Sequence, residues 1–100
     1  MIIGQIVKQP GEAFSLTVDF TAELAVAETV TGCVVTSRNY ATGADTTSAF
    51  LTGAAGVATP KVSQKCQAGA HGETHVVQFK ATTSAANIYE HEVEVAVAES

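Results

Sequence analysis

The chain has 100 residues, the length of a single domain, and 46% of them are hydrophobic, which excludes a disordered polypeptide. Its formal net charge of −5 and its five scattered Lys and Arg residues exclude the basic surface that a nucleic acid or an anionic membrane requires. We therefore expect one domain over residues 1–100.

The first segment, residues 2–7, is an apolar run without a basic start. It is shorter than the apolar core of a signal peptide, and no stretch of the chain reaches the roughly 18 apolar residues of a membrane span. The sequence therefore predicts a protein that begins in a cytoplasm. Residues 4–8 are expected to form the first strand, which ends before the turn at Pro10-Gly11.

Alternation of apolar and polar residues marks the later segments, above all residues 14–20, 77–82 and 92–97. A period of two is typical of antiparallel strands with one buried and one solvated face. The expected strands are residues 4–8, 13–20, 29–38, 47–52, 60–67, 73–83 and 88–98.

Turn-forming residues separate these strands. Asn39 to Thr47 is expected to be a polar loop, and residues 53–56, 68–73 and 84–87 are expected to be turns. Residues 21–28 (TAELAVAE) have helical propensity over about two turns. We interpret them as a short turn or helical crossover between strands.

Seven short strands with regular turns predict an all-β fold, namely an immunoglobulin-like β-sandwich of about seven antiparallel strands, with a small barrel as the alternative. The chain has no Trp, and Cys33 and Cys66 are too close in sequence for the bridge of antibody domains. In a reducing compartment both cysteines are expected to be free thiols. Residues 30–35 are apolar on both faces, so the direction of Cys33 stays open.

The shared phase of the strands predicts the core. Its expected members are Phe14, Leu16, Val18, Val34, Val62, Val77, Phe79, Val93 and Val95. His75 and His91 fall in phase with these residues, and we interpret both as aromatic side chains at the edge of the core.

The chain carries no catalytic or cofactor-binding signature. Residues 53–56 (GAAG) lack the Lys and Ser/Thr of a nucleotide-binding loop. His71 and His75 leave a Gly-rich turn rather than sharing a helix face, and the cysteines lack the close pair of a zinc site. We expect no catalytic residue, no cofactor and no metal, and hence no enzyme.

Four glutamates gather on the last strand and tail: Glu90, Glu92, Glu94 and Glu99. Paired carboxylates perform acid–base chemistry only in a pocket that shifts their pKa values. We interpret this row as a solvated face that also discourages aggregation between sheet edges.

Several segments share their pattern with one group of proteins. They are residues 8–12 (KQPGE), residues 14–20 (FSLTVDF), Leu24, residues 28–30 (ETV), residues 69–75, residues 79–84 (FKATTS) and the late Glu/Val strand. Together they resemble small structural proteins of tailed phages and prophages, of the fibre–tail adaptor or head–tail region type. The chain departs from the family at His75, where members usually carry Tyr, and at Ser84-Ala-Ala-Asn87, where they often have Ser-Ala-Gly.

The resemblance implies a non-enzymatic virion component, assembled in the host cytoplasm, that docks onto other virion proteins near the tail or fibre attachment site. Its expected partners are virion structural proteins, with a homo-oligomer in the particle left open, and neither nucleic acid nor membrane. The alternative is a bacterial cell-surface or carbohydrate-binding Ig-like module. That alternative predicts a secretion signal and aromatic platforms, for which only Tyr40 and Tyr89 are candidates.

The loop from Asn39 to Thr47 is the first candidate docking segment. It is the longest polar insertion and holds Tyr40 beside Arg38, two residue types that are over-represented at binding hot spots. A passive, solvated connection is the alternative for this loop.

The apolar N-terminal arm is the second candidate. Its residues Ile2, Ile3 and Ile6 could add a strand to the open sheet edge of a neighbour. The favoured alternative is that the arm pairs within its own sheet.

Overall fold

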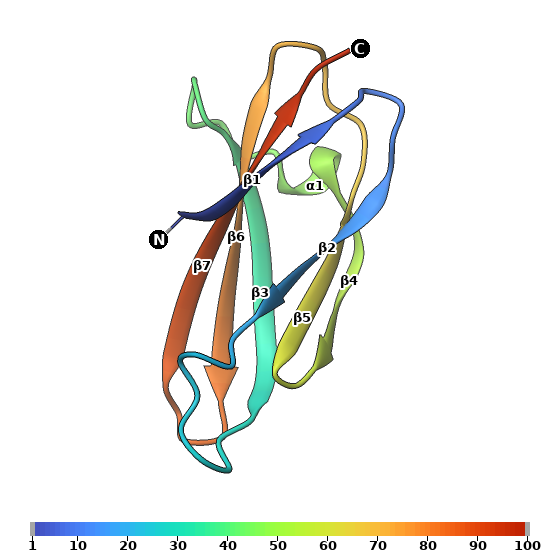
Figure 1. The fold of residues 1–100 in the computed structure, drawn as a ribbon. Helices are drawn as coiled ribbons and strands as arrows, with labels where there is room; N and C mark the ends of the chain where they lie inside the picture. Colours follow the sequence, from blue (N-terminus) through green and yellow to red (C-terminus); the bar gives the residue numbers. More distant parts are fainter. Residues whose placement is uncertain (1, 100) are drawn as a thin grey trace.

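The described part of the chain forms seven strands and one short helix (Figure 1). The structure is a computed structural model that describes the backbone of residues 2–99 and the side chains of residues 4–99. In chain order the elements are β1 (Ile2–Lys8), β2 (Phe14–Asp19), β3 (Val30–Asn39), α1 (Thr47–Phe50), β4 (Leu51–Ala58), β5 (Lys61–Cys66), β6 (Thr74–Thr83) and β7 (Ile88–Val97). No described helix is long and apolar enough to span a membrane.

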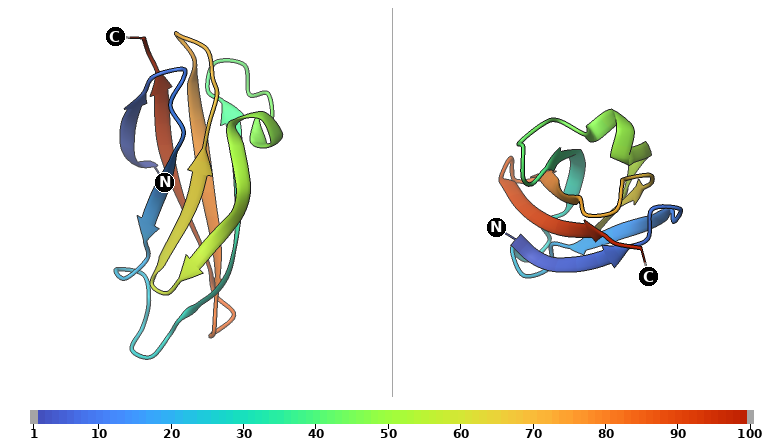
Figure 2. Two further views of the ribbon diagram at one scale, coloured as in Figure 1. Left: turned by 90° about the vertical axis from the view of Figure 1, so that its right-hand side faces the viewer. Right: turned by 90° about the horizontal axis from the view of Figure 1, so that it is seen from above.

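Two sheets face each other, one with the strand order β1-β7-β6-β3 and one with the order β2-β5-β4 (Figure 2). The predicted all-β sandwich is confirmed. Lettered A to G in chain order, the smaller sheet is B-E-D and the larger is A-G-F-C, whereas the constant-type immunoglobulin sandwich places strand A with B, E and D. One pairing differs from the antiparallel expectation, because β1 runs parallel to β7.

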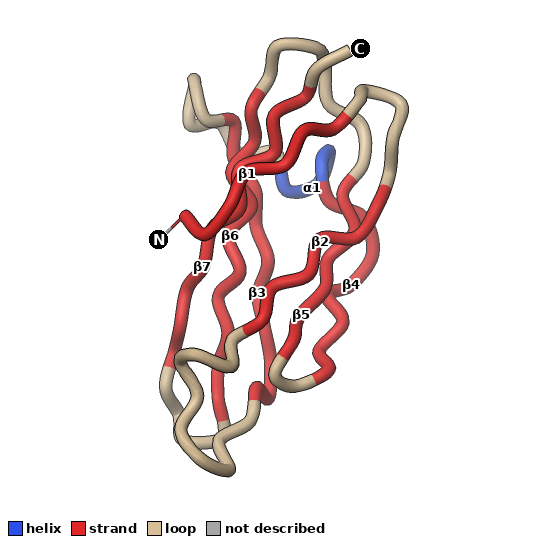
Figure 3. The backbone as a smooth tube through the Cα atoms, viewed as in Figure 1, coloured by secondary structure: helices blue, strands red, loops and turns tan. Residues whose placement is uncertain are grey.

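Apolar side chains from both sheets meet in the middle of the sandwich. Phe20, Val62, Phe79 and Val95 are fully buried there. The predicted core is confirmed for Leu16, Val18, Val62, Val77, Phe79, Val93 and Val95, and Phe14 is partly buried against it. This layer holds the sheets together and leaves the loops at the two ends of the long axis (Figure 3).

Val34 is the one predicted core residue that faces solvent, with 64% of its surface exposed. The prediction was wrong because β3 has a register shift against β6 between Val30 and Gly32. A bulge of this kind adds one residue, so side chains after it point to the opposite face. Val30 faces inward before the bulge, whereas Cys33 and Val35 take the inward positions after it.

The fourth strand was predicted in the wrong place. Residues 47–50 form helix α1, because the carboxylate of Asp45 accepts the N–H of Thr47 at 2.9 Å and Phe50 N–H donates to Thr46 O at 2.8 Å. Residues 53–56 are not a turn but lie within β4, where the register against β5 shifts between Thr52 and Gly56. Gly53, at φ +76°, lets the strand continue through this bulge.

Residues 21–28 contain turns and no helix. Their backbone bonds are local, from the N–H groups of Glu23 and Leu24 to Phe20 O and from Glu28 to Ala25 O. Of the two predicted forms, the turn is the one observed.

Both cysteines are free thiols and lie on different sheets, Cys33 half-buried on β3 and Cys66 buried on β5. Burial raises the pKa of both thiols, which lowers their reactivity as nucleophiles.

The phase of β3 and the core can be tested together. Phe79→Ala should lower the free energy of unfolding by about 3–5 kcal/mol, because it empties a fully buried position. Val34→Ala should change it by less than about 0.5 kcal/mol, since that side chain is exposed. Urea denaturation measures both values, and a Val34 effect as large as that of Phe79 would contradict the bulge.

Candidate docking surfaces

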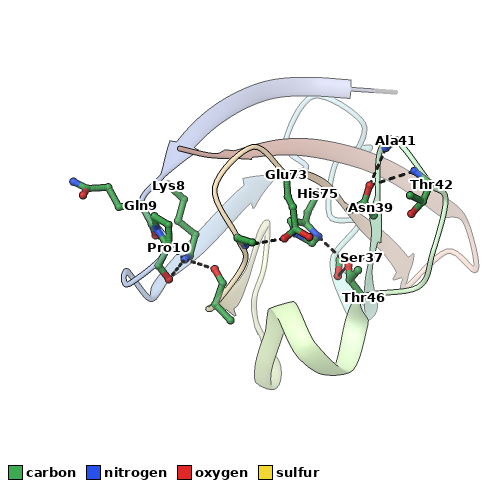
Figure 4. A network of polar contacts seen from close by, with 12 residues as sticks. Lys8, Gln9, Pro10, Ser37, Asn39, Ala41, Thr42, Thr46, Glu73 and His75 are labelled. Carbon is green, nitrogen blue, oxygen red and sulfur yellow. Dashed lines mark hydrogen bonds and ion pairs between the residues drawn. The ribbon is translucent and has the colours of Figure 1, made fainter. Parts of the chain in front are cut away.

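The loop after β3 is held in one shape by its own first residue. The side-chain oxygen of Asn39 accepts the N–H groups of Ala41 at 2.9 Å and Thr42 at 3.2 Å, and its main-chain oxygen accepts that of Gly43 at 2.8 Å (Figure 4). Asn in such a turn replaces a backbone partner, and Gly43 supplies the positive φ of 74° that the reversal needs. The loop is therefore ordered by local bonds.

Tyr40 is anchored through its backbone and exposed through its ring. Its N–H donates to Thr74 O at 2.8 Å, at the start of β6. The residue keeps 64% of its surface exposed, so the ring is available for contact.

Arg38 lies beside Tyr40 in sequence but is already paired. Its guanidinium donates to the carboxylate of Glu92 at 3.0 Å. Arg38 is on β3 and Glu92 on β7, so the side chain crosses the outer face of β6, where Val76 is fully buried outside the main core cluster. Arg38 thus serves as a brace across the sheet.

A chain of polar contacts fixes the base of this loop (Figure 4). The Ser37 and Thr46 hydroxyls are 2.8 Å apart, and Thr46 Oγ1 is 3.1 Å from Nδ1 of His75. Nε2 of His75 is 3.2 Å from the carboxylate of Glu73. The chain ties the loop to β3, to β6 and to the segment before β6.

His75 is the centre of this network and is 97% buried, in agreement with its predicted place at the core. Its ring stacks on Phe50 with the centroids 4.1 Å apart. The N–H of Ala70, and then the imidazole of His75, lower the pKa of Glu73. A hollow of about 300 Å³ is lined in part by Thr46, Glu73 and His75. These three side chains are already engaged in the polar contacts that hold the loops.

Lys8 was not singled out from the sequence as a structural residue, yet it is fully buried. Its ammonium donates to the carbonyls of Gln9 at 2.9 Å, Pro10 at 3.4 Å and Ala68 at 2.6 Å. These bonds tie the end of β1 to the loop between β5 and β6 at the same end of the sandwich as Tyr40. The sequence signal was available, since Lys8 is two residues from Ile6 and shares its face.

The N-terminal arm pairs within its own sheet, as the favoured alternative predicted, through the parallel ladder between β1 and β7. Ile6 keeps 38% exposure and Val7 67% at this edge. The side chains of Ile2 and Ile3 lie outside the described residues. The arm and the Tyr40 loop thus belong to opposite edges of one sheet and do not form a single site.

The loop between β2 and β3, at the opposite end, turns its charged side chains inward. Glu28 accepts hydrogen bonds from Ala25 N–H at 2.8 Å, from the Asn87 amide at 3.0 Å and from the Thr83 hydroxyl. These three donors, with the Ala25 N–H first, lower the pKa of Glu28.

The second glutamate of this loop also points to the protein. Oε1 of Glu23 lies 2.6 Å from Nε2 of His91, without the alignment of a hydrogen bond. The other oxygen of Glu23 and Nδ1 of His91 are buried without a partner among the described side chains. His91 also packs on Phe20, with the ring centroids 4.9 Å apart.

The apolar residues of the same loop point to solvent. Val26 is completely exposed, and its neighbours Ala22, Ala25 and Ala27 are exposed as well. Ala27 adopts a positive φ of 66°, which costs an alanine energy. Leu24 and Ala25 line a hollow of about 330 Å³ with Thr59 and Pro60. Sequence reasoning missed this surface because the direction of each side chain depends on Thr83, Asn87 and His91.

The pH dependence of stability should report the inward position of Glu28. Its folded pKa lies below the ordinary value of 4.5, so its contribution is present above that pH and is lost as the pH falls through the folded value. Glu28→Gln should therefore lower stability at pH 7, with the difference shrinking as the pH falls toward about 3. Denaturant unfolding across this range measures it, with Glu99→Gln in the tail as control, and a constant difference would contradict the arrangement.

Within residues 4–99 no three His, Cys, Asp or Glu side chains are grouped so that they could hold a metal ion. No curated protein and no solved structure matches the chain. A protein-family model, described as podophage GP4 fiber-tail adaptor protein gp77, matches residues 8–96. That match spans β2 to β6 completely and nearly all of β7. The chain therefore belongs to the Gp77 family of podophage fibre–tail adaptor proteins, and is a structural component of the virion.

Proposed function

We propose that this protein is a rigid, non-enzymatic bridge that docks onto other virion proteins near the tail or fibre attachment site, with one contact at each end of its long axis. The observation that carries the proposal is the loop between β2 and β3, whose acidic residues point inward and whose apolar residues point to solvent. The molecule measures 43 × 22 × 21 Å, so its two ends can face different neighbours.

The outward apolar tip does not bury its side chains within the domain, since Val26 is completely exposed. Exposed apolar side chains that gather in one place usually mark an interaction site. Here Glu23 and Glu28 could keep the tip hydrated, but both are held against the protein by His91, Thr83 and Asn87. The bonds of this loop therefore maintain an apolar contact surface around Val26.

The Tyr40 loop supplies the contact at the other end. A tyrosine offers a large surface with two rotatable bonds, and a loop already held in its bound shape loses little entropy on binding. Asn39 and the polar chain from Ser37 to Glu73 hold this loop in place. Because Arg38 is bound to Glu92, we assign the contact to Tyr40 and the bracing to Arg38.

A carbohydrate-binding module has less support. Such modules stack sugars on exposed aromatic rings, whereas Tyr89 packs partly buried against the core. Among the described residues Tyr40 is then the only exposed Phe or Tyr side chain, and a single such ring is a poor sugar platform.

Val26→Asp tests the apolar end. A carboxylate there would have to be desolvated on docking, so incorporation into particles should fall at least about tenfold, equivalent to about 1.4 kcal/mol. The matched control is Val34→Asp, the same change at an exposed valine of the sheet. Both variants should keep the wild-type unfolding midpoint within a few degrees, and equal incorporation of the two would refute a contact at this end.

Tyr40→Ala tests the other end. Docking should weaken by more than about 1 kcal/mol, the usual threshold for a hot spot, whereas Tyr40→Phe should retain most of the binding if ring contact dominates. Arg38→Ala should mainly destabilise the fold, since it removes the ion pair that joins β3 to β7 across the sheet. Competition between variant and wild-type protein during particle assembly measures the losses, and full competition by Tyr40→Ala would remove this loop from the interface.

A further inference from the structure

The strand β1 forms one edge of the larger sheet, and its outer side has no backbone partner in the described chain. Its only neighbour in the sheet is β7. From Gly4 to Lys8 the register against β7 is regular, from Gly4 opposite Val93 to Lys8 opposite Val97. Edge strands of this kind accept a further strand unless charges, prolines or bulges protect them.

The direction of each backbone group on β1 follows from one bond. The N–H of Ala98, which continues β7, donates to Lys8 O at 2.8 Å, so the peptide groups of Lys8 face β7. Successive residues of a strand present these groups to opposite edges. Ile6 and Gly4 therefore also bond toward β7, and the free N–H and C=O groups at the outer edge belong to Gln5 and Val7.

The side chains of β1 do not protect this edge. Its single charged residue, Lys8, points into the protein and is bound by three carbonyls. Val7 is 67% exposed, and the described strand contains no proline. Both edges of the sheet have a register shift, between Ile2 and Gly4 on β1 and between Val30 and Gly32 on the opposite edge, β3. The β3 edge differs in carrying the outward cation of Arg38.

Charge on the outer face of the sheet indicates which strand would fit. Glu92 and Glu94 are on β7, one strand in from the edge, and Arg38 reaches Glu92 from the other side by crossing β6. Among the described side chains, the carboxylate of Glu94 accepts a hydrogen bond only from the amide of Gln5, at 3.4 Å. A strand added outside β1 would stand two strand spacings, about 9.5 Å, from β7, the same separation that Arg38 already spans.

We propose that the outer edge of β1 accepts an extended segment of another virion protein as a fifth strand of the sheet, with a Lys or Arg of that segment reaching Glu94 across β1. A second copy of this chain fits less well, because its β1 presents Gln5 and Val7 on that face and keeps Lys8 buried. The proposal rests on the proposed function in taking the segment from a neighbour in the particle.

Val7→Pro tests the strand addition, because it removes an N–H that faces outward and leaves the bonds to β7 intact. We expect incorporation into particles to fall at least tenfold, while Val7→Thr, which keeps the N–H, assembles like the wild type. Ile6→Pro should instead destabilise the fold, since that N–H faces β7. Equal incorporation of folded Val7→Pro and Val7→Thr would overturn the proposal.

Hydrogen exchange on the wild-type protein tests the strand addition even if Val7→Pro fails to fold. The amide of Val7 should exchange at least tenfold more slowly in purified particles than in the free protein. An unchanged rate would overturn the proposal, as would slow exchange in a dimer of the free protein, which would identify a second copy as the occupant.

Glu94→Gln tests the charge contact. It should weaken incorporation about fivefold at low salt and less at high salt, whereas Glu90→Gln, on the same strand, should have no effect. An equal result for the two variants would overturn the assignment of a basic segment. If Val7→Pro lowers incorporation into particles while Val26→Asp and Tyr40→Ala do not, the contacts at the two ends are refuted and the strand addition stands. If Val26→Asp and Tyr40→Ala lower incorporation while Val7→Pro does not, only the strand addition is refuted.

Discussion

Face-to-face packing of the two sheets is the constraint on which the rest of the structure depends. Burying Phe79 and Val95 against Val62 and Leu16 requires that each sheet turn its apolar face to the other. Each large apolar side chain contributes about 1.5–3 kcal/mol when it leaves water. Once the inner faces are used in this way, the surfaces left for partners are the outer faces, the sheet edges and the loops at the two ends.

The polar residues that turn inward act on those remaining surfaces. Lys8 joins the end of β1 to the loop before β6, His75 joins that segment to the Tyr40 loop, and Glu28 closes the loop at the far end. A buried polar group is tolerated only when its hydrogen bonds are made, so each one specifies the position of its partners. Because the side chains of Lys8 and Glu28 point into the protein, their charges are absent from the surface around Val7 and Val26.

This arrangement suits a protein that joins parts of a particle. The three proposed contact surfaces, at Tyr40, at Val26 and at the edge of β1, lie at different places on the molecule, so the proposals allow all three to be occupied together. Loops held in a fixed shape lose less entropy on binding, and a strand edge offers main-chain hydrogen bonds with little regard to side-chain sequence. Affinity can then be divided among several modest contacts instead of one large interface.

The alternation of residues, together with apolar runs and turn residues, by itself determined the all-β class, six of the seven strands and most of the core. These follow from short-range sterics and from the burial of every second side chain, both of which are written in the local sequence. The pattern also indicated the Tyr40 loop and an N-terminal strand, because turn residues and apolar runs are local signals too. Their roles in docking stay predictions.

Only the tertiary structure decided the outward position of Val34 and the inward direction of Lys8 and Glu28. Val34 changed sides because a bulge against β6 altered the phase of β3, and a bulge is a property of two strands rather than one. Lys8 bonds to a carbonyl 60 residues away, and Glu28 to an amide 59 residues away. Partners so distant in sequence leave no periodic signal, so the placement of the charges, and with it the apolar end of the molecule, was settled only when the sheets packed.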